Sequence, residues 1–168
     1  MLYKIWNAPM PTTGSMVPVT TGTALKTLLQ VKPGATQILK VREWGISFDG
    51  SAAATPGIVT LAVTDVAATV TAHVASGIHK YDSEALAAGD PTTNIIAVGT
   101  TSTGYTASGE GTVGTHRIAD SHLIPPTGPL LYQFPLGVAF IVQAGEFLRV
   151  RVTFGAAINA LTYVLVEA

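Results

Sequence analysis

The sequence predicts an all-β protein, an antiparallel β-sandwich with a jelly roll as the expected form. Three observations lead to this prediction. Short runs of residues alternate between apolar and polar positions, which is the period of a half-buried strand. These runs are separated by turn-forming residues, with 17 glycines and 10 prolines in the chain. Only one short segment, residues 81–90, has helical character.

The expected strands follow one another along most of the chain. The longest signal lies over residues 36–50, where Leu39 and Val41 hold one parity and Trp44 and Ile46 hold the other. This switch near Arg42 predicts a β-bulge or a change of sheet. The other expected strands cover residues 24–33, 57–64, 68–74, 94–100, 129–136 and 160–168, with two more joined at Ala144 and Gly145 within residues 140–152.

The last strand is apolar on both of its faces, in the stretch "ALTYVLVEA". A strand that is covered on both sides has this composition. We therefore expect a central or interface strand at this end of the chain. Its residues Leu161, Tyr163 and Leu165 are expected to face the core or a subunit contact.

The chain is expected to form one domain over residues 17–168, preceded by an extended arm over residues 1–16. Pro9 and Pro11 favour an extended backbone in this arm. Residues 100–114, which are rich in Thr, Ser and Gly, are expected to be a long flexible loop.

Composition excludes several classes of function. Charged residues make up 11% of the chain and the formal net charge is −1, so no broad field attracts nucleic acid or an anionic membrane. The absence of cysteine excludes disulfides and thiolate chemistry. We expect no signal peptide at the N-terminus. Residues 123–145 are uncharged, but their four prolines argue against a membrane-spanning helix.

Each sequence pattern that suggests chemistry has a simpler interpretation. Residues 109–114 match G-x-G-x-x-G, but they lack the helix that a dinucleotide site needs after the motif, so we expect a plain loop. The four histidines form pairs six residues apart, too distant within one strand to share a metal ion, and are expected on the surface or in loops. They are His73, His79, His116 and His122.

The remaining polar clusters do not predict an enzyme. Asp82, Glu84 and Asp90 lack the spacing of a calcium-binding loop. Asp120, Ser121 and His122 are adjacent, but adjacency does not make a catalytic triad. Arg149 and Arg151 are expected on a polar sheet face or in ion pairs across a subunit contact, with a phosphate clamp as the alternative. We expect no cofactor and no catalytic metal, and the sequence leaves a structural calcium ion open.

Two segments carry more apolar residues than one domain needs, and these are the candidate interface. Trp44 is expected in the core, whereas Trp6 is either an anchor on a neighbouring molecule or packed on its own domain. The candidate interface residues are Tyr3, Ile5, Trp6, Leu130, Leu131, Tyr132 and Phe134.

Two stretches carry a family resemblance: "VREWGISFDGSAAATPGIVTLAVTDVAATVTAHVASG" (41–77) and "QFPLGVAFIVQAGEFLRVRVTFGAAINALTYVLVEA" (133–168). They resemble small β-sandwich proteins encoded beside the head genes of tailed bacteriophages. The resemblance implies a capsid decoration protein on the exterior of a virion, a homotrimer that braces the major capsid protein. It implies no site residues.

Two other classes of function stay open. A carbohydrate- or receptor-binding module on a phage tail would present exposed aromatic rings, and only Tyr81 and Tyr105 are expected in loops. An enzyme is the least favoured class.

Overall fold

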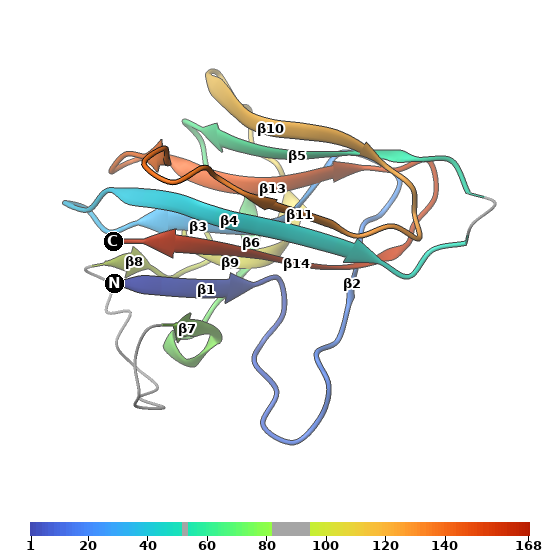
Figure 1. Ribbon diagram of the computed structural model, residues 1–168, viewed down its shortest axis with the longest axis horizontal. Helices are drawn as coiled ribbons and strands as arrows, with labels where there is room; N and C mark the ends of the chain where they lie inside the picture. Colours follow the sequence, from blue (N-terminus) through green and yellow to red (C-terminus); the bar gives the residue numbers. More distant parts are fainter. Residues whose placement is uncertain (52–53, 82–94) are drawn as a thin grey trace.

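The computed structural model describes residues 1–51, 54–81 and 95–168, and these form two antiparallel sheets that pack face to face (Figure 1). The predicted all-β sandwich is therefore confirmed. The jelly roll stays a prediction. The helical segment expected over residues 81–90 lies, apart from Tyr81, outside the described residues.

Sheet A contains both ends of the chain. Its order is β11-β4-β14-β1-β7, while β12 also pairs with β4 and β2 pairs with β14. The bounds are β1 Leu2–Trp6, β2 Val19–Thr20, β4 Leu39–Phe48, β7 Ile78–Lys80, β11 Leu130–Gln133, β12 Phe140–Val142 and β14 Asn159–Glu167.

Sheet B covers the other side of the core in the order β10-β5-β13-β3-β9-β6, with β8 paired to β3. A short 3-10 turn, η1 (Ala75–Gly77), leads from sheet B to β7 of sheet A. The bounds are β3 Lys26–Pro33, β5 Gly57–Thr64, β6 Thr69–Ala72, β8 Ile96–Ala97, β9 Gly104–Gly109, β10 His116–Ile124 and β13 Phe147–Thr153.

The core consists of the side chains that point inward from both sheets. Leu61 and Val150 of sheet B, and Trp44 and Val164 of sheet A, are each at most 1% exposed. The predicted parity switch is present, because the register of β14 against β4 shifts where Leu165 pairs with Glu43 and Val166 with Val41. The bulge at Arg42 lets Val41 and Trp44 both point inward.

The C-terminal strand is central, as predicted, since β14 lies between β4 and β1. Its inward residues are Ala160, Thr162, Val164 and Val166, each buried. Of the two positions expected for Leu161, Tyr163 and Leu165, the core is wrong, because they have the opposite parity and lie half-buried on the outer face of sheet A; a subunit contact stays a prediction.

The predicted free arm is wrong over its first part. Residues 2–6 form β1, which pairs with β14 on one side and β7 on the other. Asn7 continues this attachment, because its side chain donates to Ala160 O (3.0 Å) and accepts from Thr162 N (2.9 Å). The segment between β1 and β2 extends away from the sandwich as a loop (Figure 1).

Two further strands lie where none was expected. The predicted flexible loop over residues 100–114 contains β9, which pairs with β3 and β6. Residues 116–124 form β10, an edge strand that pairs with β5. Apolar and polar residues alternate only weakly in β10, because an edge strand is exposed to solvent along its unpaired side as well as on its outer face.

Candidate interaction surface

One edge of sheet A is interrupted by a protruding loop, Phe134–Ala139, which we call the β11–β12 loop. β11 and β12 both run antiparallel to β4, one after the other, so the loop projects from an otherwise continuous edge. Phe134 N donates to Arg42 O (2.9 Å), which fixes the loop at the bulge of β4. Its tip is a tight turn in which Val138 N donates to Pro135 O (2.9 Å) and Gly137 has φ 81°. These features indicate a type II turn, with Leu136 at its first central position.

The turn presents apolar side chains to solvent. Leu136 is fully exposed (103%), and Leu131 and Val138 are 63% and 56% exposed. Tyr132 and Ile141 on the flanking strands are also exposed. Soluble proteins seldom expose a contiguous apolar patch of this kind unless it contacts something.

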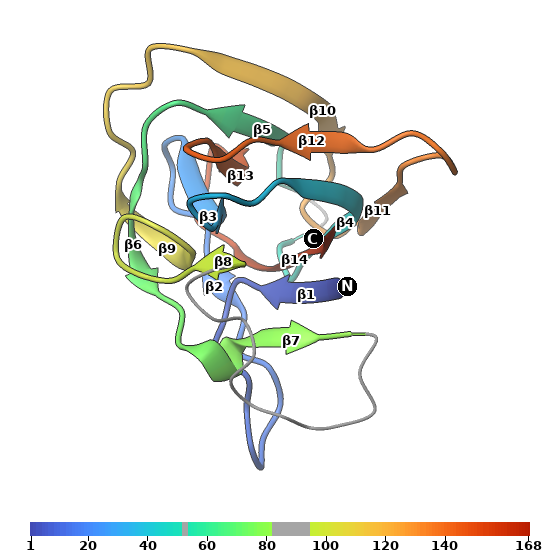
Figure 2. The same cartoon turned by 90° about the vertical axis from the view of Figure 1, so that its left-hand side faces the viewer.

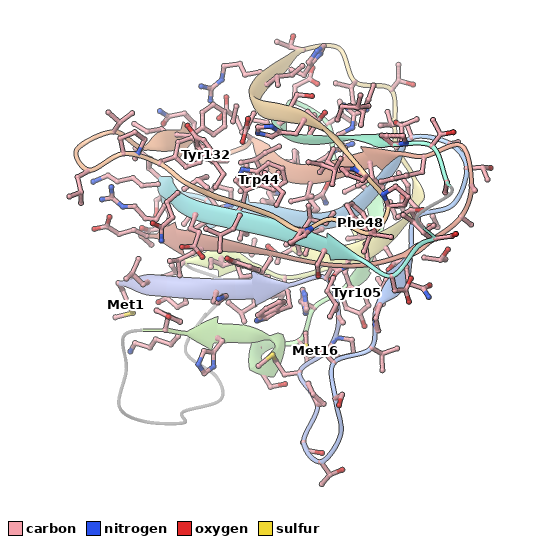
Figure 3. All side chains as sticks on the ribbon, turned by 45° about the vertical axis from the view of Figure 1, so that its right-hand side comes forward. Met1, Met16, Trp44, Phe48, Tyr105 and Tyr132 are labelled. Atoms are coloured by element: carbon pink, nitrogen blue, oxygen red, sulfur yellow. The ribbon has the colours of Figure 1, made fainter. Side chains whose placement is uncertain are left out.

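A second exposed apolar group lies on β10 and β5 of sheet B. Ile118 and Leu123 of β10 are 57% and 68% exposed, and Ile58 of β5, opposite Leu123, is 52% exposed. Figure 2 shows β10 and β12 along this side, and Arg117 of β10 donates to Ile141 O of β12 (2.9 Å). In Figure 3, Tyr132 lies beside Trp44, its register partner on β4. Ile58 and Leu123 have the parity opposite to the core residue Val59, so they lie on the outer face of sheet B and form an apolar patch separate from the loop.

A groove lies between the β11–β12 loop and the outer face of sheet A. Its volume is about 1130 Å³. Apolar residues of the loop and strands form its walls, with a few charged residues on its floor. The lining residues are Met1, Leu2, Lys40, Arg42, Glu43, Gln133, Phe134, Pro135, Leu136, Gly137, Val138, Ala139, Ile141, Leu165 and Glu167.

Most of the charge in this groove is compensated locally. Arg42 forms an ion pair with Glu167, and its hydrogen bond holds the pKa of Glu167 below the usual value. Glu43 accepts hydrogen bonds from Gln133 Nε2 (2.5 Å) and from the Tyr163 hydroxyl. Burial, and then this bond to Glu43, raise the pKa of Tyr163. The floor of the groove is thus polar but close to neutral.

The structure separates the predicted interface residues into three groups. Tyr3 and Ile5 are 0% exposed and belong to the core, so their prediction as contact residues is wrong. Leu130 and Phe134 are partly buried against the core, and Trp6 packs on Tyr163 of its own domain with the ring centroids 4.9 Å apart. Leu131 and Tyr132 remain accessible to a partner.

The sequence reasoning missed Leu136, Val138 and Ile141, the first two of which are among the most exposed apolar residues of this edge. The signal was present in Pro135-Leu136-Gly137, because a proline before and a glycine after mark a turn whose central side chain points outward.

The glycine motif is a structural loop between β9 and β10, as expected. Its Glu110 accepts from Thr27 N (2.5 Å) and Thr27 Oγ1 (2.6 Å), and from Arg149 Nη1 (3.3 Å). Arg149 is fully buried, and burial lowers its pKa while the carboxylate of Glu110 opposes that shift. Arg149 also donates to Val66 O, so it ties loops onto sheet B and pairs within its own subunit.

The histidines are not brought together. His79 and His116 are exposed and His122 contacts Asp120 (Nε2 to Oδ1, 2.7 Å), whereas His73 lies in the loop between β6 and η1 but is only 3% exposed. Its Nε2 lies 2.6 Å from Trp6 O, and burial lowers its pKa. Among residues 1–51, 54–81 and 95–168, no three His, Asp or Glu side chains are grouped as metal ligands.

Comparison of the chain with protein-family models, with curated proteins and with solved structures finds no match. In the part of the chain that the structure describes, no helix has the length and apolarity needed to cross a membrane.

Proposed function

We propose that the protein is a structural component of a tailed-phage virion that decorates the capsid exterior and stabilises it by binding the major capsid protein. The observation that carries this proposal is the exposed apolar patch of the β11–β12 loop and its flanking strands, above all the fully exposed Leu136 at the tip of the loop. The resemblance of residues 41–77 and 133–168 to phage head proteins supplies the identity of the partner.

The loop is suited to insertion into a protein surface. Its turn is closed by a hydrogen bond and anchored to β4 through Phe134, so the apolar tip loses little conformational freedom on binding. Small apolar anchors that fill a partner's pocket contribute most of the binding energy in such contacts. The neighbouring Leu131, Val138 and Ile141 would exclude water around that anchor.

The proposal includes a homotrimer, and the number of subunits is taken from the resemblance to phage decoration proteins. In a closed symmetric oligomer, identical apolar patches can cover one another. Ile58, Ile118 and Leu123 supply a second apolar patch, separate from the loop tip, for that self-contact. Light scattering of the purified protein should give about three times 17.3 kDa, and a clean monomer would remove this part of the proposal.

Shell binding is tested with two substitutions that place the same carboxylate at different exposed apolar sites. Leu136→Asp changes the loop tip, and Val17→Asp changes a 70% exposed residue just before β2. Each variant is mixed with capsids assembled from the major capsid protein encoded beside the gene, and the bound fraction is measured after sedimentation. Leu136→Asp should lose binding while Val17→Asp retains it. Equal binding of both variants would contradict the proposal.

Copy number provides an independent test of the virion location. Quantitative mass spectrometry of purified particles should find hundreds of copies in each virion, as expected for a protein that covers a shell. A few copies would indicate a tail component instead.

A further inference from the structure

The outer face of sheet A carries an ordered array of side chains, of which the proposed shell contact uses only Leu131. Strand register sets one row as Gln133, Glu43, Leu165, Lys4 and His79, on β11, β4, β14, β1 and β7 in turn. The next row is Leu131, Gly45, Tyr163 and Trp6. Rigid strands therefore hold two aromatic rings next to three hydrogen-bonding side chains.

Gly45 has no side chain, so the ring of Tyr163 can pack directly against the backbone of β4. A Cβ at this position would lie 2.8 Å from Tyr163 Cε1, so the ring of Tyr163 lies across the backbone of β4. One ring face is thus turned to the sheet and the other outward. Trp6 adjoins it at 48°, with the ring centroids 4.9 Å apart.

The outward face of the Tyr163 ring is covered by the ammonium group at the end of the flexible Lys4 side chain. Lys4 Nζ lies 4.0 Å from the ring centroid of Tyr163 and 5.1 Å from that of Trp6. Such cation–π contacts at partly exposed sites contribute about 0.5–1 kcal/mol. A ligand that stacks on the ring can therefore displace the ammonium group, which then becomes a hydrogen-bond donor beside it.

The polar groups of this face suit a neutral ligand with many hydroxyls. Glu43 is held in place by Tyr163 and Gln133, yet each carboxylate oxygen can accept a further bond. The charges of Arg42 and Glu167, which also line the groove, cancel each other in an ion pair. Sugar hydroxyls would find fixed donors and acceptors here.

The groove beside the β11–β12 loop adjoins this array and shares residues with it. Glu43, Gln133 and Leu165 belong both to the row described above and to the lining of the groove of about 1130 Å³. A ligand on the aromatic rings therefore has room to continue toward the β11–β12 loop.

We propose that the outer face of sheet A binds a neutral oligosaccharide, with Tyr163 and Trp6 stacking on a sugar ring and Glu43, Gln133 and Lys4 bonding its hydroxyls. Sugar rings present apolar C–H faces to aromatic rings and hydroxyls to planar polar groups. This activity is independent of the proposed attachment to a shell: one face adheres to a glycan while the apolar edge contacts protein.

The test uses the whole protein and isothermal titration with a panel of soluble, neutral oligosaccharides of glucose, galactose, mannose, xylose and N-acetylglucosamine. The wild-type protein should bind at least one of them with a dissociation constant in the micromolar to millimolar range. Trp6→Ala should weaken that binding by about tenfold or more, because about 1.4 kcal/mol or more of stacking is lost. Tyr163→Phe retains the ring and should weaken binding less than Trp6→Ala.

Controls separate this proposal from the shell contact and from loss of fold. Thermal unfolding identifies any variant that no longer folds, and Tyr163→Phe keeps the core intact because Tyr163 lies on the outer face. Trp6→Ala should retain capsid binding, and Val17→Asp, which lies outside the groove, should retain glycan binding. The proposal is overturned if no member of the panel binds, if only anionic sugars bind, or if Trp6→Ala binds as the wild type does.

Discussion

Two apolar stretches near the end of the sequence have opposite positions in the fold. β14 is paired on both sides at the centre of sheet A, and its Val164 is 0% exposed. The β11–β12 loop projects from the edge of the same sheet, and its Leu136 is 103% exposed. The same kind of side chain stabilises the fold in one place and leaves a surface uncovered in the other. Strand pairing, and not hydropathy, distinguishes the two.

The largest effect is expected from a charge in β14. Val164→Asp places a carboxylate between the sheets with no partner, and such groups cost several kcal/mol, about the whole stability of a small domain. The variant should therefore be unfolded or insoluble. Val164→Ala, which removes only two methyl groups, should fold and lose about 2 kcal/mol in denaturant unfolding. A soluble Val164→Asp with an unchanged midpoint would contradict the central placement of β14.

An intermediate effect is expected at His73, which links the connection after β6 to β1 through Trp6 O. The groups that contact the His73 ring are Tyr105 of β9, the Trp6 carbonyl and Gly77, none of them an acid that would stabilise a protonated ring. Because burial lowers the pKa of His73, the unfolded chain binds the proton more tightly. Its contribution to stability is therefore complete above the unfolded pKa of about 6.5 and falls as the pH drops below it.

The measurement for His73 is the free energy of unfolding between neutral and mildly acid pH. The slope from this residue is at most about 1.4 kcal/mol per pH unit. His73→Gln should flatten the profile, whereas His116→Gln, at an exposed position, should leave it as in the wild type. Identical profiles for all three proteins would show that His73 titrates freely in the fold.

The smallest effect on stability is expected at Leu136, which makes the comparison with Val164 direct. Leu136→Asp adds the same carboxylate to a side chain that is fully exposed. Surface changes of this kind alter stability by less than about 0.5 kcal/mol. Denaturant unfolding should give the wild-type midpoint. A loss of more than about 1 kcal/mol would mean that the loop packs against the fold.

The sequence predicted the strands that alternate cleanly and missed those defined by distant partners. The parity switch near Arg42 and the burial of Trp44 could be predicted, because a bulge changes the apolar–polar pattern within a few residues of sequence. β1 has the right alternation, with Tyr3 and Ile5 inward, but its partner β14 lies at the other end of the chain. Local pattern cannot report such pairing, and the segment was therefore interpreted as an arm.

The candidate surface was predicted only in part for a similar reason. Leu131 and Tyr132 lie on the exposed edge as expected, whereas Leu130 and Phe134 turn toward the core. Tyr132 has the same parity as Leu130 and is nevertheless 36% exposed at the edge of the sheet, so alternation alone does not decide which of these residues is accessible. The outer face of sheet A was not predicted at all, because Glu43, Tyr163 and Trp6 meet only after three strands pair.

The pairing of β1 with β14 has a consequence for the timing of synthesis. Asn7 finds its hydrogen-bond partner Ala160 across a separation of 153 residues. Ribosomes add about 5–20 residues per second, so β1 waits roughly 8–30 s for its partner to be made. During that interval the side chains of Tyr3 and Ile5 lack their final cover, and chaperone binding to the nascent chain would protect them. Sheet A is thus completed only late in translation, and its closure depends on contacts that form slowly.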